Sequence, residues 1–139
     1  MTAIVVTAAK VGLVNPLKAI VKSYIAGVAI TAGEAVYIIA ASGKVGLADG
    51  NGAGKYQCRG IALGPAAAGQ AVDVVEKGEV YGFTLAGNYD TRVYVSDTEG
   101  ALADSNGTKT MVVGRVSPMA DKDLTKVLMV ETDRISEVT

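Results

Sequence analysis

A sequence repeat constrains this chain more than any other feature. Residues 36–49, which begin Val-Tyr-Ile and end Leu-Ala-Asp, are answered by residues 93–104, which begin Val-Tyr-Val and end Leu-Ala-Asp. Asn-Gly follows soon after each copy, and two further segments recur downstream: 59–65 as 113–118, and 71–76 as 126–131. An offset of about 55 residues is typical of a duplicated supersecondary unit. Strand residues and turn glycines recur rather than reactive side chains, so the repeat indicates a scaffold.

The composition favours strands over helices. Half of the 139 residues are hydrophobic, 17 are glycine, and only 5% are aromatic. Valine and isoleucine suit pleated, half-buried surfaces, whereas glycine disfavours a helix interior by about 1 kcal/mol. Many short strands with regular turn signals are typical of an all-β sandwich or barrel. We therefore expect a compact antiparallel β-barrel or sandwich built from two similar β repeats, with an extended N-terminal arm.

The domain organisation follows from the same pattern. We expect an N-terminal arm at residues 1–17, a single β domain at 18–131 and a C-terminal tail at 132–139. Within the domain, the repeats fall at about 34–79 and 91–131. Whether the repeats form one barrel or two lobes is left open by the sequence, as is the oligomeric state.

The residues that carry most catalytic and metal chemistry are scarce. The chain has no histidine and one cysteine, which excludes Ser-His-Asp or Cys-His catalysis and an intramolecular disulfide, and makes a zinc site improbable. The glycine-rich segment 50–55 is no phosphate loop, because Asp49 and Tyr56 stand where that motif needs glycine and Ser/Thr. The two Asp-x-Asn-Gly turns, 49–52 and 104–107, lack the glutamate that an EF-hand needs at its twelfth position. We expect no enzyme, no cofactor and no bound metal.

Three other side chains have a structural interpretation beside a functional one. Cys58 lies in an apolar strand and is expected to pack as a small hydrophobe rather than react as a thiol. Tyr37 and Tyr94 occupy matching places in the two copies. Cross-strand packing explains that pair more simply than a sugar-binding site does.

The charge pattern bears on nucleic acids and membranes. The net charge is −1, with acidic and basic residues interspersed, so no basic cluster is present to bind a phosphate backbone. The most apolar stretch, 19–41, carries Lys22 and Glu34, and a bilayer span requires about 20 residues almost free of charge. The N-terminus lacks the basic leader of a signal peptide. We expect neither nucleic-acid nor membrane binding.

The N-terminal arm is the candidate interaction site. It is too hydrophobic for a solvated tail, and a strand can extend the sheet edge of a neighbour through backbone hydrogen bonds. The sequence leaves two alternatives with equal weight: the arm contacts a partner, or it is the first strand of its own fold. The residues predicted to form the partner interface are Ile4, Val5, Val6, Val11, Leu13, Val14 and Pro16.

Several segments resemble small virion proteins of tailed bacteriophages and prophages. The resemblance rests on Ala-Gly-Glu-Ala-Val-Tyr at 32–37, Arg-Gly-Ile-Ala-Leu at 59–63, Ala-Ala-Gly-Gln-Ala-Val at 67–72, the run 93–104 and Val-Val-Gly-Arg-Val at 112–116. It covers roughly residues 8 to 131. In these segments the chain is similar to capsid decoration, or cement, proteins, whose modules also occur in head fibres.

The resemblance implies a function. A decoration protein binds the outer capsid surface, stabilises the mature shell by bridging major capsid protein subunits, and often clusters as a trimer or dimer. It would be made in the cytoplasm of the host bacterium and carried on the virion. No catalytic residues follow from the resemblance. The alternative is a tail, baseplate or fibre module that takes part in host attachment, and a small enzyme or ligand-binding domain is a third, less favoured, reading.

Overall fold

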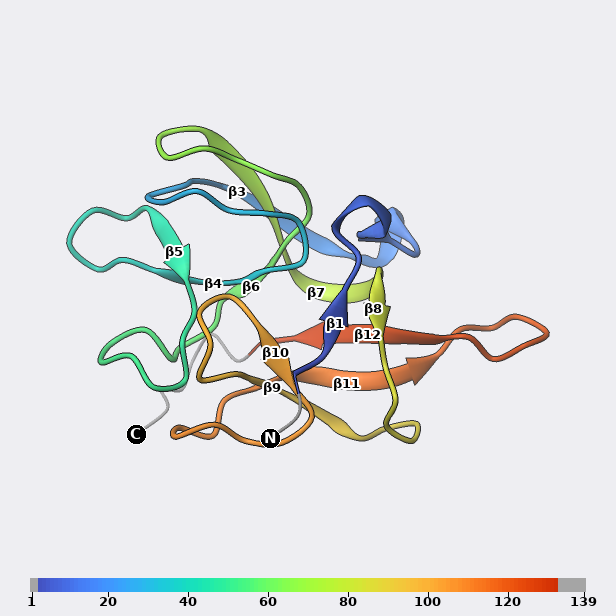
Figure 1. The fold of residues 1–139 in the computed structure, drawn as a ribbon. Helices are drawn as coiled ribbons and strands as arrows, with labels where there is room; N and C mark the ends of the chain where they lie inside the picture. Colours follow the sequence, from blue (N-terminus) through green and yellow to red (C-terminus); the bar gives the residue numbers. More distant parts are fainter. Residues whose placement is uncertain (1–2, 133–139) are drawn as a thin grey trace.

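The structure, a computed structural model, describes residues 3–132 and is built from short strands (Figure 1). Of the predicted C-terminal tail, only Thr132 falls within this range. The strands are β1 (Val5–Val6), β2 (Gly12–Leu13), β3 (Ile20–Ile25), β4 (Ala35–Ile38), β5 (Val45–Leu47), β6 (Gly60–Ala62), β7 (Ala71–Tyr81), β8 (Phe83–Thr84), β9 (Arg92–Val95), β10 (Leu102–Ala103), β11 (Val112–Pro118) and β12 (Lys126–Glu131). Two single turns of 3₁₀ helix, η1 (Ala8–Lys10) and η2 (Pro16–Lys18), interrupt the N-terminal segment.

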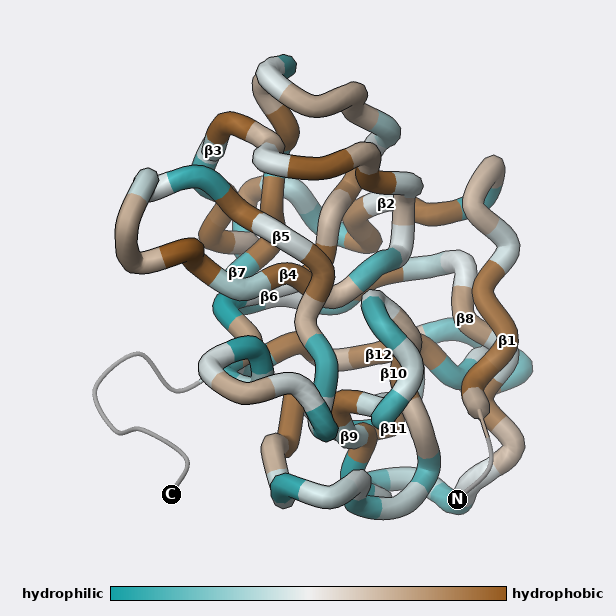
Figure 2. Tube along the Cα trace, turned by 60° about the vertical axis from the view of Figure 1, so that its left-hand side comes forward, coloured by the Kyte–Doolittle hydropathy of each residue, from teal (hydrophilic) through white to brown (hydrophobic). Residues whose placement is uncertain are grey.

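Ten strands form one antiparallel sheet that curls into a half-barrel, and β1 pairs with β8 in a second, small sheet. This confirms the predicted all-β class. Along the main sheet the order is β10-β9-β11-β12-β7-β6-β4-β5, and both β2 and β3 also pair with β7. In Figure 2 the apolar segments follow the strands, including β1, while many of the turns are hydrophilic.

The two sequence copies have the same strand order. Reading from the outside, β5-β4-β6-β7 in the first copy corresponds to β10-β9-β11-β12 in the second. The register agrees as well: Val36 faces Gly60 in the first copy, and Val93 faces Gly114 in the second. Equivalent residues therefore make equivalent pairs, as a duplicated unit requires.

Strand β7 belongs to both copies. Its residues 71–77 pair with β3, and its residues 77–80 pair with β12. In the first copy, the first strand, β3, pairs with the last strand, β7. In the second copy, the first strand is β7, and it pairs with the last strand, β12. At the meeting point, Lys77 faces Glu131, and the Nζ–Oε1 distance of this exposed pair is 3.8 Å.

Two hydrophobic cores lie on opposite faces of β4, β6 and β7. Neighbouring residues in these strands contribute to different cores, because side chains alternate across a strand. The first core contains Val36, Ala62 and Val74 together with Tyr24, Ala26, Ile30, Val45, Ala66 and Val72. The second contains Ala35, Ile61 and Val75 together with Ala48, Cys58, Val80, Leu85, Val93, Val95, Leu102, Met111, Val113, Val116, Leu128 and Val130. The first copy therefore supplies part of the core of the second.

Replacing Ile61 by alanine tests this shared wall. Ile61 belongs to the first copy but is fully buried in the second core. We expect Ile61→Ala to lower the free energy of unfolding by about 2–5 kcal/mol, as for other buried isoleucines. Val28→Ala, at an exposed position, should change it by less than about 0.5 kcal/mol. Urea unfolding followed by circular dichroism measures both, and equal effects would show that Ile61 does not pack as described.

Candidate functional site

The chain has no histidine and a single cysteine, and the structure describes residues 3–132. No group of three or more histidine, cysteine, aspartate or glutamate side chains in this range could hold a metal ion. No helix in the same range has the length and apolar character needed to span a bilayer. The candidate site is the surface that the N-terminal arm forms, where the sequence predicts a partner interface.

The arm lies between two strands of the second copy. Ala3 pairs with Ala103 of β10, and the Ile4 N–H donates to the Leu102 carbonyl at 2.9 Å. Next, β1 pairs with β8 through Val5 with Thr84 and Val6 with Phe83, and the Thr7 N–H donates to the Gly82 carbonyl at 2.8 Å. Figure 1 shows β1 beside β8, with β10 nearby. The backbone of residues 3–7 thus joins β10 to β8.

The corresponding edge of the first copy needs no such insert. There, the residue after β3 closes the edge directly: Ala26 forms a parallel bridge with Val45 of β5, and the Gly27 N–H donates to the Val45 carbonyl at 2.8 Å. In the second copy the residues after β7 form β8, which reaches β10 only through the arm. The arm is therefore an added strand that only the second copy has.

The rest of the arm continues along β7. Leu13 pairs with Val80, and the Val14 N–H donates to the Glu79 carbonyl at 3.0 Å. Pro16 begins η2, where the Asn15 side chain accepts the Leu17 N–H at 3.1 Å. The backbone of the arm therefore pairs with strands of its own chain, as in the alternative in which the arm is the first strand of its own fold.

The arm side chains divide into two groups. Ile4, Val11 and Leu13 are half-buried against the second core. Val5 is 63% exposed and Val6 37% exposed. The Val5 side chain points outward, whereas the Val6 Cγ2 methyl fills the space that a Cβ on Gly33 would need. A partner contact through these two side chains stays a prediction. Val14 is half-buried and Pro16 is exposed on the same segment.

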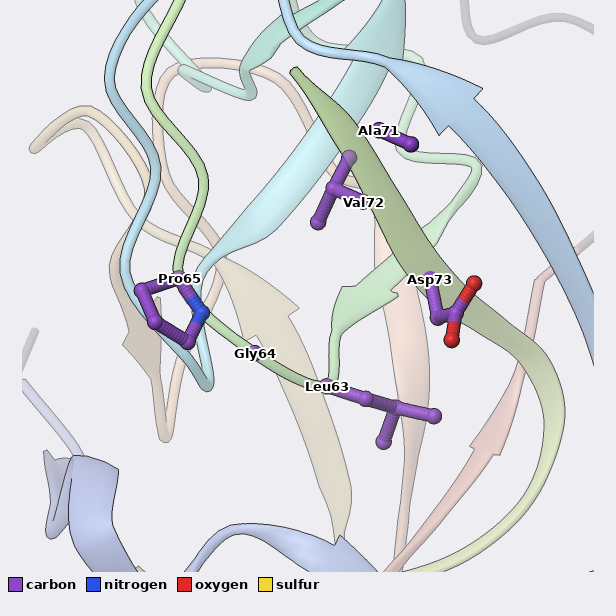
Figure 3. Close-up of a pocket in the computed structure, with 6 residues that line it drawn as sticks. All are labelled: Leu63, Gly64, Pro65, Ala71, Val72 and Asp73. Carbon is purple, nitrogen blue, oxygen red and sulfur yellow. The ribbon is translucent and has the colours of Figure 1, made fainter.

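Two hollows open on the described surface, and the first of them borders the arm. One, of about 340 Å³, has Ala3 and Ile4 as one wall and includes Arg92 and Asp104. The other, of about 320 Å³, is shallow and lies between residues 63–65 and the start of β7 (Figure 3). Its one charged lining residue, Asp73, already accepts a hydrogen bond from the Ser23 hydroxyl. Neither lining includes a histidine or a cysteine.

Comparison with family models, curated proteins and solved structures finds no match to this chain.

Asp97 is a structural residue that sequence reasoning missed. Its carboxylate accepts the Thr108 N–H at 2.8 Å and the Thr108 hydroxyl at 2.9 Å. Beside it the two copies meet, because the Gly50 N–H donates to the Ser96 carbonyl at 2.8 Å. The repeat holds a signal for this junction: the position matching Asp97 in the first copy is Ala40, which has no side-chain oxygen. A polar residue that occurs in only one of the two copies indicates a contact that the other copy does not make.

The residues with alternative functional readings are packed or bonded locally. The Asp49 carboxylate accepts the Asn51 N–H at 2.9 Å, which is ordinary turn chemistry. Tyr37 packs against the second core, and its ring approaches Gly46 on the facing strand. This geometry supports the cross-strand interpretation of the tyrosine.

Cys58 provides a prediction about reactivity. The side chain is fully buried, and its Sγ lies 3.4 Å from the Gly60 carbonyl. Burial raises the pKa of the thiol from 9.0 to about 12. Since the thiolate is the nucleophile, we expect a disulfide reagent at pH 8 to leave the folded protein unmodified and to label it once in urea. Rapid labelling of the folded protein would show that the site opens locally.

Proposed function

We propose that this chain is a structural virion protein that decorates the outer surface of a bacteriophage capsid and bridges major capsid protein subunits. The main support is the arm, which backbone pairing holds on the sheet while Val5, 63% exposed, presents an apolar side chain outward. The phage-like segments support it independently: 32–37 and 93–104 form strand-and-turn elements of the two copies. A β domain of this kind can bind a partner through a complementary surface and apolar contacts.

Lattice binding explains how modest contacts stabilise a shell. A subunit that touches two capsid proteins makes its second contact intramolecularly, which multiplies avidity by roughly 10²–10⁴. Binding only the mature shell adds roughly 2.7 kcal/mol per site when the free protein is about 100-fold above its Kd. Repeated over a lattice, these increments oppose the internal pressure of packaged DNA.

Binding to assembled shells tests the proposal. The proposal implies a major capsid protein from the same phage; shells of that protein are mixed with the purified chain and sedimented. The proposal expects saturable co-sedimentation and a higher disruption temperature of the shells. Val5→Asp should weaken binding at least tenfold, because a carboxylate replaces an apolar contact. Leu124→Asp should not, although that side chain is also more than half exposed and lies far away in the sequence. Absence of binding by the unaltered protein would refute shell decoration.

The number of copies per particle separates decoration from the alternative. A tail, baseplate or fibre module uses a β body of the same kind but occupies one place on the virion. Quantitative mass spectrometry of purified particles should find hundreds of copies for a shell protein and a handful for a tail protein.

A further inference from the structure

Strand β3 has one unpaired edge. It pairs with β7 along its whole length, from Ile20 opposite Lys77 to Ile25 opposite Ala71. In the part of the chain that the structure describes, no strand pairs with its other edge. A six-residue edge strand carries backbone donors and acceptors that another strand can satisfy. The pairing of β3 with β7 shifts register between Ile20 and Val21 and is regular from Val21 to Ile25, so this regular stretch of edge stays open to another strand.

The free edge is unusually apolar. Leu17, just before the strand, is 96% exposed, and Ile20, Val21 and Ile25 are 56%, 40% and 44% exposed. Only Tyr24 of the strand is buried. Exposed apolar side chains along an open strand edge mark a surface that pairs with another strand.

We propose that β3 pairs antiparallel with β3 of a second copy of this chain, about a two-fold axis at Ser23. In an antiparallel pair, facing residues point to the same side of the sheet. Because side chains alternate along each strand, the two-fold axis of a symmetric pair must pass between two copies of one residue. Within Ile20–Ile25, the two central choices are Lys22 and Ser23. An axis at Lys22 would place two ammonium groups opposite each other, which destabilises the pair.

An axis at Ser23 makes the strand complementary to itself. Val21 then faces Ile25 of the second copy, which covers both exposed side chains. Lys22 faces Tyr24 of the second copy, whose hydroxyl donates to the buried Glu76 carboxylate at 2.6 Å. Within one chain the Lys22 Nζ already lies 5.0 Å from the centroid of the Tyr24 ring, so this contact type suits the two side chains. The small Ser23 side chains meet at the axis.

This interface is distinct from the arm. It involves the first copy, whereas residues 3–7 lie on the second copy. It would join the sheets of two molecules into one continuous sheet. The inference does not depend on the proposed capsid function, because it rests only on the geometry of β3.

Matched charge substitutions locate the interface. Sedimentation velocity of the full-length protein should give the mass of two chains, and Val21→Asp should give the mass of one chain with an unchanged circular dichroism spectrum. Val5→Asp, the same change in the exposed arm, should remain a dimer. A monomeric unaltered protein overturns the proposal and gives Lys22 the role of protecting the edge from pairing. A dimer that only Val5→Asp disrupts overturns it in favour of the arm.

Cysteine cross-linking tests the register. Facing residues have Cβ atoms about 4.5–5.5 Å apart, close to disulfide geometry, whereas diagonal ones are about 7–8 Å apart. Ser23→Cys should therefore oxidise to a covalent dimer, and Lys22→Cys should do so much more slowly. Ser42→Cys, on an exposed turn, is the control for random collision, and buried Cys58 should not interfere. Faster cross-linking of Lys22→Cys, or equal rates for Ser23→Cys and Ser42→Cys, overturns the register.

Discussion

Replacing Gly114 by alanine is expected to lower the free energy of unfolding by about 4 kcal/mol or more, enough to prevent accumulation of folded protein. A Cβ on Gly114 would overlap the carbonyl oxygen of Met129 and lie 2.8 Å from its carbonyl carbon. Both atoms belong to the backbone of β12, so no side-chain rotation relieves the clash. The substitution therefore forces β11 away from β12, the pair around which the second core packs. Soluble yield and urea unfolding measure the loss.

The control and the second copy make this prediction specific. In β2, Gly12 has no heavy atom within 4 Å of where its Cβ would stand, so Gly12→Ala should change stability by less than about 0.5 kcal/mol. Gly60 holds the place of Gly114 in the first copy, and its Cβ would overlap the Val75 carbonyl oxygen. We therefore expect Gly60→Ala to be severely destabilising as well. If Gly114→Ala unfolds no earlier than Gly12→Ala, the register of β11 on β12 is wrong.

Removal of residues 1–7 is expected to loosen the second copy while leaving the first intact. The deletion takes away the strand between β8 and β10, including the hydrogen bonds from Ile4 and Thr7. From these bonds and the partial burial of Ile4 we expect a loss of about 2–4 kcal/mol. Backbone hydrogen exchange should accelerate at β10 and stay slow at β5, whose edge Ala26 closes. Hydrogen exchange with mass spectrometry of peptides from both copies measures this contrast.

Two further measurements separate the structural role of the arm from its proposed binding role. A synthetic peptide of residues 1–8 should restore slow exchange at β10 when added to the shortened protein, because strand pairing does not require covalent attachment. Val5→Asp should keep full stability yet weaken shell binding, since Val5 faces outward. If a protein lacking residues 1–14 still folds and decorates shells with unchanged affinity, the arm is no partner site.

The fold class could be predicted from the sequence because strand signals are local. β-Branched residues and recurrent turn glycines marked β4, β5, β9 and β10 and their equivalence. The shared strand could not be predicted in the same way. Residues 77–81 of β7 correspond to β3 but retain little of its sequence, so the second repeat becomes recognisable only near residue 91. Backbone pairing preserves a strand without preserving its side chains.

The candidate site was only partly predictable. Hydrophobicity singled out the arm, but periodicity says nothing about which edge a two-residue strand joins. The contrast between the closed edge at Ala26 and the inserted arm depends on contacts between residues far apart in the chain. The open edge of β3 could not be predicted for the same reason, because the sequence of a strand does not show whether a second strand pairs with each of its edges. Asp97 shows a different limit. The sequence shows that the matching residue in the first copy is Ala40, but only the structure shows that Asp97 binds Thr108 where the two copies meet.

Because one uninterrupted strand closes the first unit and opens the second, neither unit has a boundary of its own. A cut near Lys77, where the two pairings meet, would separate the parts of β7 that pair with β3 and with β12, so this molecule should melt in a single step and resist being expressed as halves. Removing either unit would therefore also remove backbone on which the other depends.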